Sequence, residues 1–181
     1  MPKETKLQIL KCFSNLLEKN ELDKITVTML VEECNISRQT FYYHFSDIQS
    51  LIDWGVKYYT ENCVQEAKNA KNMMEATMIY LKRVDANRDF LRSCVSSSLV
   101  GYITTLIRKS IIEYSTEFYN QSVTISPERA KEAEFIIEFT ANGVTGYILS
   151  MLYSRKDDNI EEIAEMMNKC VFKKLSQGDI D

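Results

Sequence analysis

The chain has 181 residues, of which 45% are hydrophobic and 27% charged, and its formal net charge is −4. This length suits one ordinary domain, or a small domain joined to a larger one, with enough apolar residues for a buried core. Only 5 glycines and 2 prolines occur, which favours long helices over turn-rich β-structure. Since no apolar run approaches the roughly 18 residues of a transmembrane helix and the N-terminus is charged, we expect a cytoplasmic protein with neither membrane contact nor secretory signal.

The 5 cysteines and 1 histidine have no metal-ligand spacing. We therefore expect neither a metal ion nor a cofactor. In a reducing cytosol the cysteines serve as small apolar residues, and a redox-sensing thiol is the alternative.

The first predicted helix covers residues 3–19, and a polar segment at 20–24 follows it. Its apolar residues recur three or four positions apart, which is the spacing of one helix face. The expected buried stripe consists of Ile9, Leu10, Phe13, Leu16 and Leu17.

Residues 25–54 predict two short helices joined by a tight turn, followed by the start of a third helix. Thr26 is a good N-cap for the first helix, and Ser37 can cap the second, which covers 38–45. Asn35 lies between them and tolerates the left-handed backbone that a tight turn needs. The agreement of caps and turn indicates a helix-turn-helix.

The surface of the helix at 38–45 carries a cation, an amide, a hydroxyl, two phenols and an imidazole, and no acid. Such groups suit the phosphate oxygens and base edges of DNA. They belong to Arg38, Gln39, Thr40, Tyr42, Tyr43 and His44. The alternative is an aromatic-rich core helix in an all-α domain.

The charge balance of this region does not by itself favour DNA, because residues 1–60 hold 7 Lys and Arg against 8 Asp and Glu. The cations would have to be concentrated on one face. The candidates are Lys3, Lys6, Lys24, Arg38 and Lys57.

The segment NISRQTFYYHFSDIQSLIDW resembles the DNA-binding signature of the TetR family of bacterial transcriptional regulators. Its RQTFYYHF variant is similar to a subgroup typified by the activator of dihydroxyacetone kinase operons. The match covers roughly residues 5–58, and the remainder resembles the family only in its helical layout.

The resemblance implies roles for the residues of the helix-turn-helix. Phosphate contacts are implied for Ser37, Thr40, Tyr42 and His44, base contacts for Gln39 and Tyr43, and either role for Arg38. The family's lysine at the start of the following helix is Ile48 here, and its turn glycine is Asn35. A pH switch or metal ligand at His44 is an alternative.

Ser46 and Gln49 form a possible capping box for a long helix that continues to about Lys71. This helix would join a DNA-binding domain at 1–48 to an effector-binding and dimerisation domain at 49–181 without a flexible linker. A rigid rod of this kind can transmit a tilt, and Gly55 is its only weak point.

The remainder predicts helices at 73–85, 90–97, 99–119, 127–154 and 160–175. Pro127 suits the first position of a helix that Ser126 caps. The fold class is therefore all-α, with about nine helices: a three-helix helix-turn-helix domain followed by a larger helical domain.

The last two helices have the pattern of a subunit interface. Phe139, Gly143, Gly146 and Ser150 follow helical spacing, and two mid-helix glycines, each costing about 1 kcal/mol relative to Ala, are tolerable where another helix approaches. The last helix adds Ile160, Ile163, Met167 and Cys170. The resemblance implies a four-helix dimer bundle and a homodimer on a palindromic operator; otherwise both stripes close the monomer core.

Six side chains lie on helices that surround the family's ligand pocket, and we expect effector contacts from them, with plain core packing as the alternative. They are Tyr80, Phe90, Cys94, Tyr102, Phe139 and Tyr147.

The sequence offers no nucleophile–base pair and no glycine-rich phosphate loop, so we do not expect an enzyme. We expect a sequence-specific regulator that binds double-stranded DNA and is modulated by a small-molecule effector. The alternative is an activator controlled by a protein co-regulator bound to the C-terminal domain. A large internal pocket would favour the effector, and an exposed apolar patch beyond the dimer face would favour the co-regulator.

Overall fold

The computed structural model describes residues 2–122, 127–154 and 159–169, and all regular structure in these ranges is helical. The elements are α1 (Pro2–Leu17), η1 (Leu22–Lys24), α2 (Val27–Glu33), α3 (Arg38–His44), α4 (Ile48–Ala67), α5 (Met73–Ala86), α6 (Arg88–Val95), α7 (Val100–Ser122), α8 (Pro127–Tyr153) and α9 (Ile160–Met167). The expected all-α fold is confirmed within these ranges.

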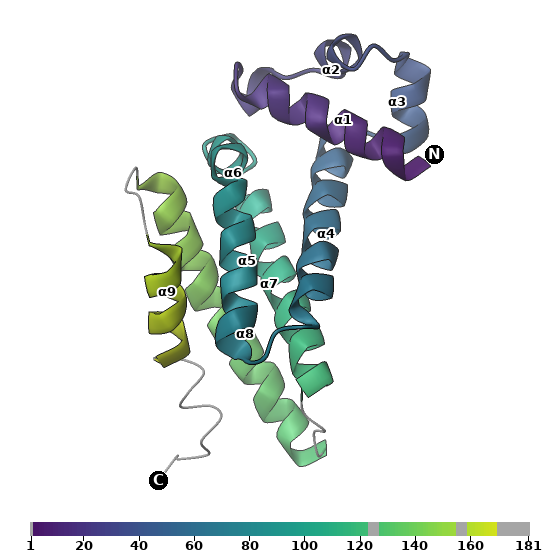
Figure 1. Ribbon diagram of the computed structural model, residues 1–181. Helices are drawn as coiled ribbons and strands as arrows, with labels where there is room; N and C mark the ends of the chain where they lie inside the picture. The colour runs from purple at the N-terminus through teal and green to yellow at the C-terminus, as the bar shows by residue number, and fades with distance from the viewer. Residues whose placement is uncertain (1, 123–126, 155–158, 170–181) are drawn as a thin grey trace.

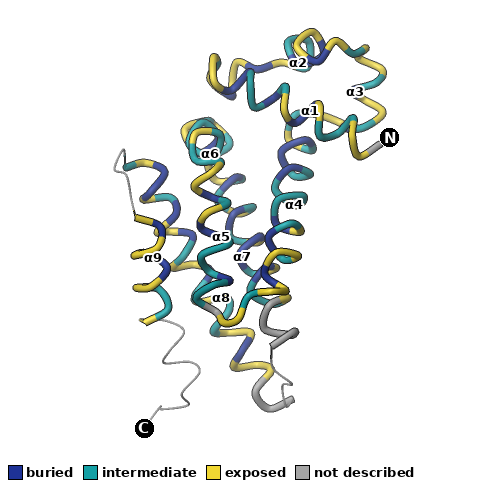
Figure 2. Tube along the Cα trace, viewed as in Figure 1, coloured by how far each residue is buried: buried dark blue, intermediate teal, exposed yellow. Residues whose placement is uncertain are grey.

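Helices α1–α3 form an N-terminal domain at one end of the molecule, and α4 leads from it into a bundle with α5–α9 (Figure 1). The predicted stripe of α1 is confirmed, since all five of its residues are buried. In the bundle, α7 packs against both α4 and α8, while α5 packs against α4 and α9. Figure 2 shows the buried faces turned inward. Because α4 begins in one unit and ends in the other, a domain boundary near residue 48 stays our proposal.

The local signals around the helix-turn-helix are confirmed. The side chain of Thr26 accepts a hydrogen bond from the Met29 amide at 3.3 Å, and Ser37 accepts one from the Thr40 amide at 3.0 Å. Asn35 has φ of 52°, the left-handed conformation that the turn requires.

The cap of α4 differs from the prediction. Asp47, not Ser46, is the N-cap, and its carboxylate accepts a hydrogen bond from the Ser50 amide at 2.7 Å while the Asp47 amide donates to the Ser50 hydroxyl at 3.2 Å. An ionised carboxylate is a stronger acceptor than a hydroxyl, so the residue one position later begins the helix.

Helix α4 is also shorter than expected, since it ends at Ala67. Asn72 caps α5 by accepting a hydrogen bond from the Glu75 amide at 3.0 Å, and it does so in an extended conformation. A residue held extended for this purpose cannot continue the preceding helix.

Candidate nucleic-acid interface and internal cavity

Helix α3 presents polar and aromatic groups to solvent while its apolar residues anchor it. Phe41 is fully buried and Phe45 nearly so. Tyr43 is 80% exposed and Tyr42 is 54% exposed, which leaves two large rings in water beside the exposed Gln39. Exposed aromatic groups of this size on one short helix indicate a surface that a partner covers.

The start of α3 is held by a compact set of contacts. The Ser37 and Thr40 hydroxyls lie 2.9 Å apart, and Arg38 donates from Nη2 to the Thr28 hydroxyl of α2 at 2.5 Å. At the other end the His44 ring packs edge-on against Tyr43, with centroids 4.9 Å apart. All seven predicted DNA-contact residues thus lie on, or at the cap of, one helix, with Thr40 and His44 half-buried and the other five exposed.

The predicted cations of the domain fall into two groups. Lys24 pairs with Glu21 at 3.1 Å, and Lys57 pairs with Glu61 at 4.0 Å. Lys6 instead lies over the rings of Phe45 and Trp54, with its Nζ 5.1 Å and 5.5 Å from their centroids, and Lys3 lies over Tyr58. These aromatic contacts hold Lys6 beside the end of α3.

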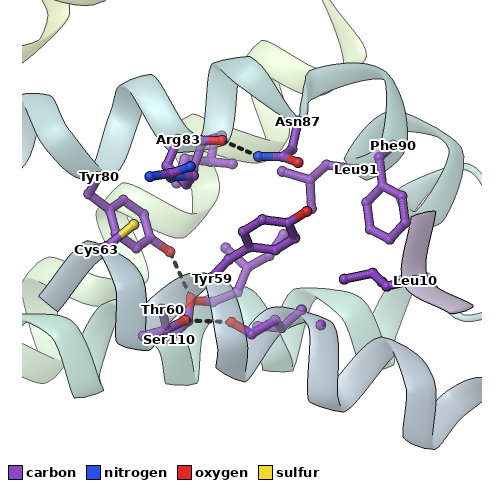
Figure 3. A pocket seen from close by; sticks show the side chains of 15 residues that line it. Leu10, Tyr59, Thr60, Cys63, Tyr80, Arg83, Asn87, Phe90, Leu91 and Ser110 are labelled. Carbon is purple, nitrogen blue, oxygen red and sulfur yellow. Dashed lines mark hydrogen bonds between the residues drawn. The ribbon is translucent and has the colours of Figure 1, made fainter. Parts of the chain in front are cut away.

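An internal cavity of about 70 Å³ lies where α4, α5, α6 and α7 meet α1 and α8 (Figure 3). A single water needs roughly 10–15 Å³ of such space, so the cavity has room for a group larger than one water molecule. Its lining is mostly apolar, with a few polar side chains. It is lined by Leu10, Gly55, Val56, Tyr59, Thr60, Cys63, Tyr80, Arg83, Val84, Asn87, Phe90, Leu91, Ile107, Ser110 and Ile148.

The polar groups around the cavity are partly engaged with each other. Tyr80 and Ser110 share a hydrogen bond of 2.7 Å, and Arg83 pairs with Glu66 of α4. Asn87 donates to the Arg83 carbonyl at 2.7 Å. Tyr59 extends its phenol into the cavity (Figure 3), and burial raises the pKa of this phenol, which keeps it protonated.

Of the six residues from which we expected effector contacts, Tyr80 and Phe90 line this cavity and the other four do not. Cys94 is buried elsewhere, where burial raises the pKa of its thiol to about 12. Tyr102 donates to Asp53 of α4, while Phe139 and Tyr147 are exposed on α8. The missed residues Tyr59, Arg83 and Asn87 lie on the same helix faces as Cys63 and Tyr80. Their spacing of three, four or seven residues from Cys63 or Tyr80 was the sequence signal that could have predicted them as cavity-lining residues.

One face of α8 is exposed and apolar. Phe135 is 68% exposed and Phe139 is 72% exposed, and their rings stack with centroids 6.1 Å apart. A Cβ added at Gly143 or Gly146 would have no atom within 4 Å, so this face is open along its length. Residues 130–153 have the length and composition of a possible membrane span, with a mean hydropathy of 1.3, and α8 packs against α6 and α7 in the bundle.

Helix α9 corrects part of the interface prediction. Ile160 and Ile163 are buried inside the subunit in a cluster with Leu81 and Met151, so they close the monomer core and do not face a partner. Met167 is half-buried against the same cluster. Cys170 lies outside the described residues.

A helix-turn-helix with an exposed, acid-free second helix, carried on an all-α bundle with an internal cavity, defines a DNA-binding transcriptional regulator. The family model described as "Transcriptional regulator C-terminal region", of the TetR type, matches residues 68–173. The chain therefore belongs to the TetR family of transcriptional regulators.

Relatives support this assignment. The HTH-type dhaKLM operon transcriptional activator DhaS of Lactococcus lactis subsp. lactis (strain IL1403) is 24% identical over 82 residues, a match that spans 45% of this chain and 44% of that protein. Among solved structures, the dihydroxyacetone kinase operon activator DhaS has a TM-score of 0.75 at 15% identity, covering 95% of this chain and 96% of that one. A TetR regulator from Streptococcus agalactiae 2603V has a TM-score of 0.67 at 19% identity, covering 94% of each chain.

Proposed function

We propose that this regulator acts in the cytoplasm as a homodimer on a palindromic operator, and that Gln39 and Tyr43 read base edges. The exposure of Tyr43 on an acid-free helix carries this proposal, because that side chain is 80% exposed and its ring packs edge-on against its chain neighbour His44. The residues that flank these base-reading positions contact phosphates: Ser37, Thr40, Tyr42 and His44. Arg38 faces α2, where it donates a hydrogen bond to the Thr28 hydroxyl.

The experiment begins with duplexes selected by the protein from a random library. In a mobility shift, Gln39→Ala should relax discrimination at one base position by roughly 1–3 kcal/mol. Tyr42→Phe should instead weaken selected and unrelated DNA alike, because its hydroxyl meets phosphate. An unchanged shift for the double variant Gln39→Ala, Tyr43→Ala would refute the assignment.

We propose further that the cavity holds a small-molecule effector. Its volume of about 70 Å³ and mostly apolar lining, with the Tyr59 phenol projecting inward, support a compact ligand with one polar group. The alternative is that a protein co-regulator binds the C-terminal domain, since the relatives named above include operon activators. In the described parts of the chain, the large exposed apolar side chains outside α3 and α8 are Val100 and Met166, which lie on different helices. Two single side chains do not form a second docking patch, which favours the small molecule.

The homodimer proposal rests on α8. Phe135, Phe139 and Tyr153 are more than half exposed, and the two open glycines between them permit a close helix approach. Because Ile160 and Ile163 of α9 are buried within the subunit, we expect α8 to supply most of the interface.

A further inference from the structure

Asp23 joins two segments that are 75 residues apart in the chain. Its carboxylate accepts hydrogen bonds from the Ser98 amide at 3.0 Å and from the Ser98 hydroxyl at 2.7 Å. Asp23 lies in η1, at the edge of the N-terminal domain, and Ser98 lies in the corner between α6 and α7. We name this set of contacts the Asp23 clamp.

The Asp23 clamp gives the N-terminal domain a second support. The first is α4, which leaves the domain beneath the middle of α1, whereas α6 lies beneath the C-terminal end of α1 (Figure 1). Beside the clamp, Phe13 of α1 packs edge-on against Phe90 of α6, with ring centroids 5.8 Å apart. A domain joined at one end alone can rock, whereas two separated supports fix its tilt.

The α6–α7 corner is tied in turn to the end of α8. Arg92 donates from Nε to the Leu152 carbonyl at 2.9 Å, and the Tyr153 hydroxyl donates to the Val95 carbonyl at 3.2 Å. Tyr153 ends the exposed face of α8. Contacts therefore run from that face through the corner to Asp23.

We propose that Asp23 and Ser98 are positioning residues for DNA binding, which set the angle between the N-terminal domain and the α8 face and so the distance between the two α3 helices of a dimer. This inference rests on the proposed homodimer. Each added base pair rotates one half-site by about 35° about the DNA axis, so a dimer of fixed geometry accepts one spacing. The clamp thus determines operator spacing without touching DNA.

The setting of the Asp23 clamp suits a positioning role. Both residues are exposed, and Asp23 borders a groove of about 430 Å³, so the clamp is outside the core and we expect the domains to stay folded without it. The hydrogen bonds from Ser98 hold the pKa of Asp23 below its usual range, which keeps the carboxylate charged at neutral pH. Charge-assisted hydrogen bonds are short and directional.

The test uses selected half-sites placed at a series of spacings that differ by one base pair. For the unmodified protein we expect the best spacing to exceed its neighbours by roughly tenfold or more in affinity, a preference within the range of allosteric couplings. For Asp23→Ala we expect that preference to fall below about threefold. The base preference within each half-site should not change. Asp23→Asn, which keeps an acceptor for Ser98, should restore part of the spacing preference.

Glu21→Ala is the matched control, because it removes the same charge from the same turn and contacts Lys24, not Ser98. A spacing profile for Asp23→Ala that matches the unmodified protein, or a change in affinity that is the same at every spacing and is also seen for Glu21→Ala, overturns the clamp. Thermal melting verifies that both variants are folded. An unmodified protein with no spacing preference overturns the proposed dimer, and the clamp with it.

Discussion

At the scale of single residues, the turn of the helix-turn-helix depends on Asn35. Its φ of 52° is a conformation that costs an ordinary L-residue roughly 1–2 kcal/mol. We expect Asn35→Ala to lower the free energy of unfolding by about 1 kcal/mol and Asn35→Gly to leave it unchanged or raise it slightly. Urea denaturation of the three proteins measures this, and equal stability of the Ala and Gly variants would contradict it.

The charge of Asp23 gives the clamp a defined pH dependence. Hydrogen bonds from Ser98 hold the folded-state pKa below the ordinary value of 3.8. A depressed pKa stabilises the folded state at pH values above the ordinary pKa, and this stabilisation is lost as pH falls through the lower folded value. The difference in melting temperature between Asp23→Ala and the unmodified protein should therefore be larger at pH 7 than at pH 3. Glu21→Ala supplies the reference, and a difference that grows toward acid pH would disprove the coupling.

At the scale of helices, Gly55 has a packing role. It is buried on α4, and a Cβ there would lie 3.0 Å from Leu10 Cδ1 of α1. The sequence suggested a weak point in a rod, but the glycine permits the close approach of two helices from different parts of the molecule.

This packing predicts opposite outcomes for two glycine substitutions. Gly101→Ala on α7 meets no atom within 4 Å and should stabilise the protein by roughly 0.5–1 kcal/mol. Gly55→Ala gains the same helix propensity but displaces the flexible end of Leu10, so we expect little net stabilisation and a changed operator affinity. Urea denaturation and a mobility shift measure both variants. Equal stabilisation by the two substitutions would show that Leu10 does not restrict the site.

The helices and their caps were largely predictable from sequence because the signals are local. Thr26, Ser37 and Asn35 each act within three residues, and the order of the helices followed from apolar spacing. The cavity was not predictable in the same way. Which face of α7 or α8 turns inward depends on contacts between distant helices, so the sequence could not show that Tyr80 lines the cavity while Tyr102 and Tyr147 do not.

At the scale of the whole molecule, α8 has two apolar faces, one buried in the subunit and one exposed. Ala141, Ile148 and Leu152 are buried in the subunit, while Phe135 and Phe139 remain in solvent. From the sequence alone, the exposed face of α8 and the buried stripe of α9 could not be told apart. Apolar residues recur every three or four positions both in a helix that packs inside its own subunit and in one that packs against a second subunit.

The dimer prediction follows from the open glycines. Gly143→Leu should be tolerated by the isolated subunit, since nothing lies within 4 Å of that position, but should separate two α8 helices in a dimer. We expect loss of the dimer by light scattering together with loss of operator affinity. Gly101→Leu, which is equally exposed on α7, should leave the mass unchanged. A monomeric unmodified protein at micromolar concentration would refute the interface.

The aromatic contacts beside α3 have a practical consequence. The chain holds a single tryptophan, Trp54, which stacks on Tyr58, packs against Phe45 at the end of α3 and lies beneath Lys6. Indole emission depends on the charges and rings around it, so the protein carries its own fluorophore at the junction of α3 and α4. An unlabelled sample titrated with operator DNA or with a small molecule should therefore report, by its emission wavelength, whether that junction has moved.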